Sequence, residues 1–367
     1  MLFWLLNTYS DALATWHIAS PGETRVFLTA RTALATVSSF LVAVLYGPFA
    51  IRWLKKHFRE RIDSASPRLN ELHSTKKSTP TMGGLFIVVA IVAAALLCGD
   101  LGNRFLQLGI VTVVLFGAIG AVDDWVKNRT SKRGLTARQK FAAQCVASIL
   151  ILFPLYWHLR SFPQMQGLPL NLGLLTVALG PAFVLWGGFV MVGTSNGVNL
   201  TDGLDGLAGG CLLIAGSAFA ALSYLAGHKV MAAYLEIPHV TGTGELCILF
   251  GAMIGALLGF LWFNCHPAMV FMGDTGSLPL GALLAYGALC IRQELLLLVI
   301  GGVFVIETLS VIAQVVSFKL TGKRIILCSP LHNHFVFRGD PETRIVVRFW
   351  IGSAVLALLA VASLKIR

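Results

Sequence analysis

Long apolar stretches alternate with short polar ones along the whole chain. Most of the apolar stretches run for about 17 to 24 residues, and a helix needs about 20 such residues to cross roughly 30 Å of hydrocarbon. The pattern predicts ten membrane-spanning helices, over residues 26–46, 82–98, 105–122, 141–158, 172–192, 207–226, 246–263, 278–291, 295–318 and 345–364. No Lys or Arg precedes the apolar start of the first twenty residues, which predicts an interfacial segment there and not a signal peptide. We therefore expect an all-α polytopic membrane protein, with residues 1–367 forming a single domain.

Composition supports this fold class and excludes others. The chain is 56% hydrophobic and 12% charged, whereas an ordinary soluble domain carries about 25% charged residues. Its seven cysteines are scattered and form no C-x-x-C pair, which excludes a small disulfide scaffold.

The basic residues indicate how the chain is oriented. Of the 28 Lys and Arg residues, 19 fall in the loops 47–81, 123–140 and 319–344. Cytoplasmic loops carry such an excess, so we expect these three loops at the cytoplasmic face and both termini on the periplasmic side. The net charge of +11 then needs no nucleic acid to explain it, because a basic inner face beside anionic lipid is sufficient.

Carboxylates collect at the cytoplasmic ends of the predicted helices. The five acidic residues placed there are Asp123, Asp124, Asp202, Asp205 and Asp274. The loops 193–206 and 264–277 contain no Lys or Arg, so their carboxylates lack a local cationic partner at a boundary where desolvation is costly. A bound Mg²⁺ would neutralise them, since it prefers carboxylate oxygens and keeps the rest of its shell for water and substrate phosphates. A single Asp-Gly pair is more often a turn or a helix cap, but five carboxylates from three loops favour the metal.

Other polar positions in the chain are harder to interpret. The letters of Gly193–Gly197 match the G-x-S-x-G pattern of hydrolases, but an apolar span precedes them where that pattern requires a strand. His332 and His334 lie in a basic loop and could bind phosphate or carry protons. Glu307 lies inside the ninth predicted span with no evident partner, and no role follows from the sequence.

Several motifs together resemble one family of membrane enzymes. They are Asp123-Asp124, Asn196-x-x-Asn199-x-x-Asp202-Gly-x-Asp205-Gly, Phe271-Met-Gly-Asp274-x-Gly-Ser, Thr79-Pro-Thr-Met-Gly-Gly and His332-x-His334. In this order and across ten spans they resemble the polyprenyl-phosphate N-acetylhexosamine-1-phosphate transferases, and within them the branch whose donor is UDP-N-acetylmuramoyl-pentapeptide. The chain departs from the family at Asn333, where a histidine is usual, and at Ser78, where a glycine is usual.

The resemblance implies a reaction and its partners. Phospho-N-acetylmuramoyl-pentapeptide would pass from its UDP carrier to undecaprenyl phosphate, giving lipid I and UMP in a bacterial inner membrane, with Mg²⁺ as cofactor and a homodimer as one option for assembly. A sister enzyme that transfers N-acetylglucosamine-1-phosphate is the nearest alternative. A transporter is a more distant one, because its ionisable groups would cluster near mid-membrane in repeated halves.

The resemblance also assigns residues to roles. The implied catalytic residues are Asp123, Asp124, Asp274, His332 and His334, with Asp123 or Asp124 as a base beside the lipid phosphate. The implied metal ligands are Asn196 and Asp274. The implied substrate-binding residues are Lys76, Asn199, Asp202, Asp205, Asn264, Phe271 and Gln314, with Phe271 against the uracil ring. Direct displacement by the lipid phosphate is favoured over a covalent aspartyl intermediate, because a carboxylate that binds a metal is a poor nucleophile.

Overall fold

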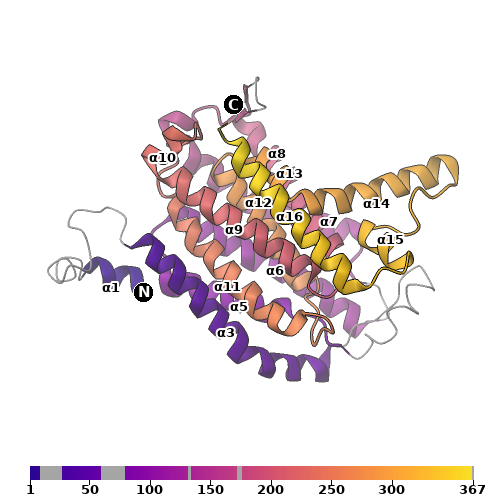
Figure 1. The fold of residues 1–367 in the computed structure, drawn as a ribbon. Coiled ribbons are helices and arrows are strands. Elements are labelled where there is room, and N and C mark those ends of the chain that lie inside the picture. Colours follow the sequence, from indigo (N-terminus) through magenta and orange to yellow (C-terminus); the bar gives the residue numbers. More distant parts are fainter. Residues whose placement is uncertain (9–26, 59–78, 131–133, 172–175, 366–367) are drawn as a thin grey trace.

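The computed structural model describes residues 1–8, 27–58, 79–130, 134–171 and 176–365, and Figure 1 shows them as a bundle of slanted helices. The helices are α1 (Leu2–Thr8), α3 (Leu28–His57), α5 (Gly84–Cys98), α6 (Arg104–Arg129), α7 (Ala137–Arg160), α8 (Phe183–Thr201), α9 (Leu207–Gly227), α10 (Lys229–Tyr234), α11 (Leu246–Asn264), α12 (Asp274–Cys290), α13 (Glu294–Ile300), α14 (Gly302–Thr321), α15 (Leu331–Phe337) and α16 (Glu342–Ser363). Two short strands, β1 (Pro169–Asn171) and β2 (Thr176–Ala178), pair in an antiparallel hairpin between α7 and α8.

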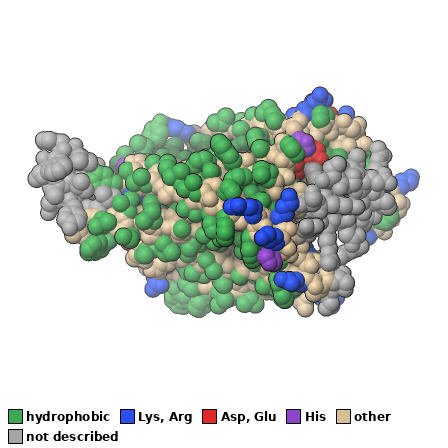
Figure 2. Space-filling model, turned by 90° about the horizontal axis from the view of Figure 1, so that it is seen from below, with side chains coloured by type: hydrophobic (Ala, Val, Ile, Leu, Met, Phe, Trp, Pro, Cys, Tyr) green, Lys and Arg blue, Asp and Glu red, His purple; other side chains and the backbone are tan. Residues whose placement is uncertain are grey.

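The helices have the length and composition of a polytopic membrane protein. Within the described residues, seven segments are long and apolar enough to cross a membrane: α3, α6, α7, α9, Thr243–Asn264, α14 and α16. The helix α5 is apolar but shorter, while α8 and α12 have 19 and 17 residues. Figure 2 shows one face of the bundle covered largely by apolar side chains, with most of its visible Lys and Arg side chains toward one end. The predicted fold class is therefore confirmed as an all-α polytopic membrane protein.

Several predicted spans end later in the structure, since α3 continues to His57 and α6 to Arg129, and two of the ten are interrupted. The fifth was expected to begin at residue 172, but the β1–β2 hairpin occupies that region and α8 begins at Phe183, after the turn at Pro181. The ninth was expected to be continuous over 295–318, but it divides at Gly301 into α13 and α14. The adjacent glycines 301 and 302 are poor helix formers, which explains the break at this point.

Several polar residues expected in loops belong to helices instead. The helix α6 continues to Arg129, so Asp123 and Asp124 lie in its last two turns. The helix α8 continues to Thr201, and its last two turns carry Asn196 and Asn199. A helix positions such side chains more rigidly than a loop would, because each is held by the backbone ladder of its own helix.

The helix α12 lies at the centre of the bundle. All of its 17 residues are buried, and it packs against α5, α6, α8 and α9. Glycines allow its first turn to approach its neighbours closely. A Cβ atom on Gly120 of α6 would lie 2.1 Å from the carbonyl oxygen of Asp274, and one on Gly84 of α5 would lie 2.0 Å from the nitrogen of Gly276. Only residues without a side chain permit this spacing, which brings Asp274 next to α6.

Candidate active site

Three carboxylates meet where α6 ends and α12 begins. Asp123, Asp124 and Asp274 each place one carboxylate oxygen within 4.8 Å of the other two, and all three side chains are buried. Helix ends from α7 and α8 reach the same place, through Lys140 and Asn199. The sequence prediction that carboxylates from separate loops gather at one depth holds for these three. Their hard oxygen donors fit a divalent cation such as Mg²⁺.

Two lysines, Lys127 and Lys140, lie among these carboxylates. The Nζ atom of Lys127 is 2.8 Å from Asp123, 2.9 Å from Asp274 and 3.6 Å from Asp124. Lys140 hydrogen-bonds Asp274 and lies 3.6 Å from Asp123. Asp274 thus has cationic partners from other segments, although it lacks a local one as expected. Its own loop has none, but the ends of α6 and α7 supply two.

Neutral donors hold the carboxylates in place. Asp124 accepts hydrogen bonds from the backbone nitrogen and the hydroxyl of Thr275, at 2.9 and 2.7 Å. Asp274 accepts one from the amide of Asn199 at 2.7 Å, and Asp123 accepts one from the backbone nitrogen of Leu135 at 2.7 Å. These bonds fix the orientation of the three carboxylates, so their remaining oxygen lone pairs are positioned to bind a cation.

The Thr79–Gly84 motif supports the loop that leads into Asp274. The backbone nitrogen of Phe271 donates to Pro80, and those of Gly83 and Gly84 donate to Phe271 and Met272, at 2.8 to 2.9 Å. Phe271 is half-buried at this point. The two motifs are thus one structural unit, in which the glycines allow the backbones to approach closely.

A second group of polar side chains lies around the turn 202–206. Asp205 accepts a hydrogen bond from the backbone nitrogen of Ala268 and lies 3.1 Å from Nδ1 of His266, which is 3.8 Å from Glu342. Asn264 accepts from the backbone nitrogen of Gly206 at 2.9 Å and donates to the carbonyl of Val270. The predicted residues Asp205 and Asn264 therefore lie together and connect this turn to the 264–270 loop.

Other predicted residues have different surroundings. Asn196, the predicted metal ligand, donates to Gln144 and to the carbonyl of Val192 at 2.8 Å, while Asn199 is the amide that contacts Asp274. Gln314 bonds the backbone of Ile325 and Ile326 and so holds their loop against α14. Their predicted roles stay predictions. Lys76 lies outside the described residues, and no interaction follows for it.

The histidine loop is tied to the buried acid on α14. The backbone nitrogen of His332 donates to Glu307 at 3.1 Å, and its Nδ1 lies 3.2 Å from the same carboxylate. His334 accepts from the backbone nitrogen of Leu327, and the side-chain oxygen of Asn333 is buried without a hydrogen-bond partner among the described residues. Glu307, for which the sequence offered no partner, thus has one in His332.

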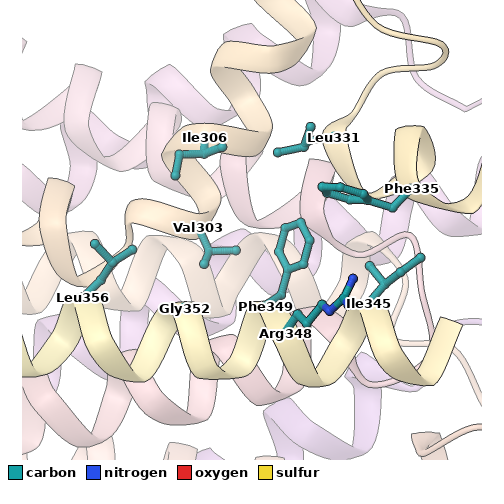
Figure 3. A pocket seen from close by; sticks show the side chains of 9 residues that line it. All are labelled: Val303, Ile306, Leu331, Phe335, Ile345, Arg348, Phe349, Gly352 and Leu356. Carbon is teal, nitrogen blue, oxygen red and sulfur yellow. The ribbon is translucent and has the colours of Figure 1, made fainter. Parts of the chain in front are cut away.

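An apolar cavity of about 300 Å³ lies beside this loop, between α14, α15 and α16 (Figure 3). Its lining residues are Val303, Ile306, Leu331, Phe335, Ile345, Arg348, Phe349, Gly352 and Leu356. Phe335 and Phe349 meet edge to face across it, and Arg348 brings a guanidinium group to its wall. The shape and lining suit a hydrocarbon chain with an anionic end.

Comparison with known proteins gives an end-to-end match. Residues 106–292 match glycosyl transferase family 4. The phospho-N-acetylmuramoyl-pentapeptide-transferase of Nitratidesulfovibrio vulgaris strain DP4 is 44% identical over 375 residues, covering all of both chains. The proteins of the same name from Desulforapulum autotrophicum and Oleidesulfovibrio alaskensis are also 44% identical, over 93% of this chain and 94% of theirs.

The chain belongs to the phospho-N-acetylmuramoyl-pentapeptide-transferase family. The segment that matches glycosyl transferase family 4 contains the three clustered carboxylates, both lysines and the turn 202–206. The histidine loop lies beyond that segment but within the full-length match.

Sequence reasoning about this family member missed four residues at the site. Lys127 and Lys140 were counted only as part of a basic loop, Thr275 was not considered, and Glu307 was left without a role. The signal for the lysines was their position close after Asp123 and Asp124, one helical turn away in the case of Lys127. For Thr275 and Glu307 the partners are distant in sequence, and no local pattern identifies them.

Proposed function

We propose that this protein transfers phospho-N-acetylmuramoyl-pentapeptide from UDP-N-acetylmuramoyl-pentapeptide to undecaprenyl phosphate, giving undecaprenyl-diphospho-N-acetylmuramoyl-pentapeptide and UMP. The observation that carries the proposal is the 44% identity, over the whole chain, to a protein named for this transfer. The cluster of three buried carboxylates and two lysines supports it, because phosphoryl transfer depends on positioning and on the stabilisation of negative charge.

We place a magnesium ion among Asp123, Asp124 and Asp274, with Asn196 kept as a predicted further ligand. The three carboxylates supply hard oxygen donors, and Asn199 and Thr275 hold two of them in place. When bound there, Mg²⁺ would offset the negative charge that develops on the diphosphate oxygens.

The reaction we propose is a single displacement. An oxygen of undecaprenyl phosphate attacks the β-phosphorus of the donor, a new P–O–P bond forms, and the bond from that phosphorus to the bridging oxygen breaks, so UMP leaves with the electron pair. Whichever of Asp123 and Asp124 does not bind the metal accepts the proton of a singly protonated acceptor phosphate, and Lys127 and Lys140 hold phosphate oxygens at the site. The structure favours this over an aspartyl intermediate, because each of the three carboxylates is already engaged by lysine, threonine, amide or backbone donors.

The nucleotide binds, in this proposal, around the turn 202–206. The residues assigned to it are Lys76, Asn199, Asp202, Asp205, Asn264, Phe271 and Gln314. Asn264 and Asp205 are already part of one hydrogen-bonded unit, and half-buried Phe271 precedes Asp274 by three residues, which supports a place for the uracil ring beside the carboxylates.

We place the site at the cytoplasmic face of a bacterial inner membrane. Among the described residues, Lys127, Arg129, Arg138 and Lys140 lie where α6 ends and α7 begins, beside the carboxylates, and the donor is water-soluble. On this basis the chain crosses the membrane ten times as one domain, with both termini in the periplasm. The apolar cavity beside α15 fits part of the isoprenoid tail of undecaprenyl phosphate, since its lining is almost entirely apolar.

The test is UMP release by detergent-solubilised protein with undecaprenyl phosphate and Mg²⁺, comparing two donors side by side. Release with UDP-N-acetylmuramoyl-pentapeptide alone supports the proposal. Release with UDP-N-acetylglucosamine alone would assign the chain to the sister activity, and release with neither donor would contradict both. EDTA should abolish release and added Mg²⁺ should restore it.

A further inference from the structure

Glu307 is a fully buried carboxylate that the proposed reaction does not use. Its exposed fraction is 0%, and it lies on α14, within a segment apolar enough to span a membrane. An acid in this environment is costly and is retained where it has a specific partner. Here the partner is His332, whose backbone nitrogen and Nδ1 atom both approach the carboxylate, at 3.1 and 3.2 Å.

The other side of the His332 ring lies against the turn 202–206. A Cβ atom on Gly203 would be 2.2 Å from Nε2 and 2.8 Å from Cε1 of His332, so the ring occupies the space where a side chain at 203 would be. The ring itself is 1% exposed. With Nδ1 beside Glu307 and Nε2 against Gly203, the imidazole bridges α14 and the turn and has little access to a ligand.

The turn is held from its other side as well. Gly206 donates to Asn264 and accepts from the indole nitrogen of Trp350, at 2.9 and 3.1 Å. Gly206 also has a φ of +81°, a conformation that glycine adopts without strain. The turn that carries Asp202 and Asp205 therefore lies between the 264–270 loop and the His332 ring.

We propose that Glu307 and His332 act together as a strut that sets the position of the turn 202–206, and that both are positioning residues. Glu307 fixes the orientation of the ring, and the ring fixes Gly203 and the aspartates beside it. The consequence for donor binding rests on the proposed function, in which this turn contacts the nucleotide. That Glu307 and His332 set the position of the turn does not depend on the proposed function.

The first test is hydrogen–deuterium exchange of the peptide covering residues 199–210 in the full-length protein. Glu307→Ala should raise its exchange rate about tenfold, while Glu307→Gln, which still accepts a hydrogen bond, should give a smaller rise. Glu294→Ala is the matched control, because it removes a buried carboxylate that pairs with Arg292 beyond the opposite end of α12. An equal rise in the control, or no rise in Glu307→Ala, would overturn the strut.

A second test uses the close approach of Gly203. Gly203→Ala should disturb the turn through the clash with His332 and raise the KM for the UDP-linked donor about tenfold, with kcat falling less than about threefold. In a His332→Ala background the same substitution should change KM by less than about twofold, because the clashing ring is gone. Additive effects, or a loss confined to kcat, would overturn the assignment.

The two tests distinguish a failure of the positioning role from a failure of the proposed function. Exchange needs no substrate, so a strut that is present in a protein without UMP release would count against the proposed function alone. Wild-type activity with unchanged exchange in Glu307→Ala would count against the strut alone.

Discussion

Two groups of buried charges lie at opposite ends of the bundle and differ in their balance. At one end Arg31 of α3 pairs with Glu245 through two hydrogen bonds of 2.6 and 3.0 Å. The arginine also donates to the carbonyl of Cys98, and the glutamate accepts from the backbone nitrogen of Asp100. At the other end three carboxylates share two lysines, and the side chain of Lys127 is 37% exposed.

The difference indicates that the Arg31–Glu245 pair stabilises the fold, whereas the carboxylate cluster is suited to bind a ligand. In the Arg31–Glu245 pair one cation meets one anion, and the backbone adds an acceptor for the arginine and a donor for the glutamate, so the charges balance without a further ion. The carboxylate cluster carries more negative than positive groups and is reached through a partly exposed lysine. A cation can therefore enter the cluster and offset its excess negative charge.

Breaking the balanced pair gives the largest expected effect. Arg31→Ala leaves Glu245 buried without its partner, and the loss should be about 3–5 kcal/mol of stability. The measurement is the thermal midpoint in detergent, with Arg31→Lys as the control that keeps the charge. A midpoint unchanged from wild type would show that the pair has no structural role.

Breaking the unbalanced cluster should affect turnover more than stability. Asp274→Asn is expected to reduce UMP release about 10²–10³-fold and to weaken its dependence on Mg²⁺, because the carboxylate contacts both lysines and Asn199. The thermal midpoint should change little. Wild-type rates in this variant would contradict the metal assignment.

Removing a positive charge from the carboxylate cluster should raise its affinity for a cation. Lys127→Met removes an ammonium group that contacts all three carboxylates, so Mn²⁺, used as a probe for Mg²⁺, should bind roughly tenfold more tightly. Electron paramagnetic resonance of free Mn²⁺ measures this without any turnover. Lys127→Arg keeps the charge and should leave the affinity close to that of wild type, whereas weaker binding in Lys127→Met would contradict a cation site here.

The smallest effect is expected at Asn333, between the two histidines. Its side-chain oxygen has no hydrogen-bond partner among the described residues, so Asn333→His removes no interaction that the structure shows. UMP release should stay within about twofold of wild type. A large gain or loss would mean that this position contacts a substrate.

Much of the fold followed from the sequence because lipid imposes a simple rule. Backbone polar groups in a membrane must be satisfied within a helix, so apolar length alone located most of the helices. The exceptions have local causes. The β1–β2 hairpin and the break at Gly301 both interrupt apolar segments, and apolar length alone does not predict such interruptions.

At the site, residue type and spacing predicted five carboxylates at one depth, and the structure brings three of them, Asp123, Asp124 and Asp274, into one cluster. The spacing indicates the Lys127–Asp123 pair, one turn apart on α6, but it could not show that Lys127 and Lys140 contact Asp274. Those contacts join the ends of α6, α7 and α12, which lie far apart in the chain. Residue type and spacing also could not pair Glu307 with His332, since 25 residues separate the two.

The sequence by itself determined that this protein is a helical membrane protein whose Asp123, Asp124 and Asp274 come to the same end of the bundle, because hydrophobic length and the position of polar residues at helix ends are local properties of the chain. The tertiary structure alone decided which charges meet and which stay in excess. Close approach at Gly84, Gly120 and Gly203 brings distant segments within hydrogen-bonding distance, and such contacts depend on how the helices pack, which no single segment specifies.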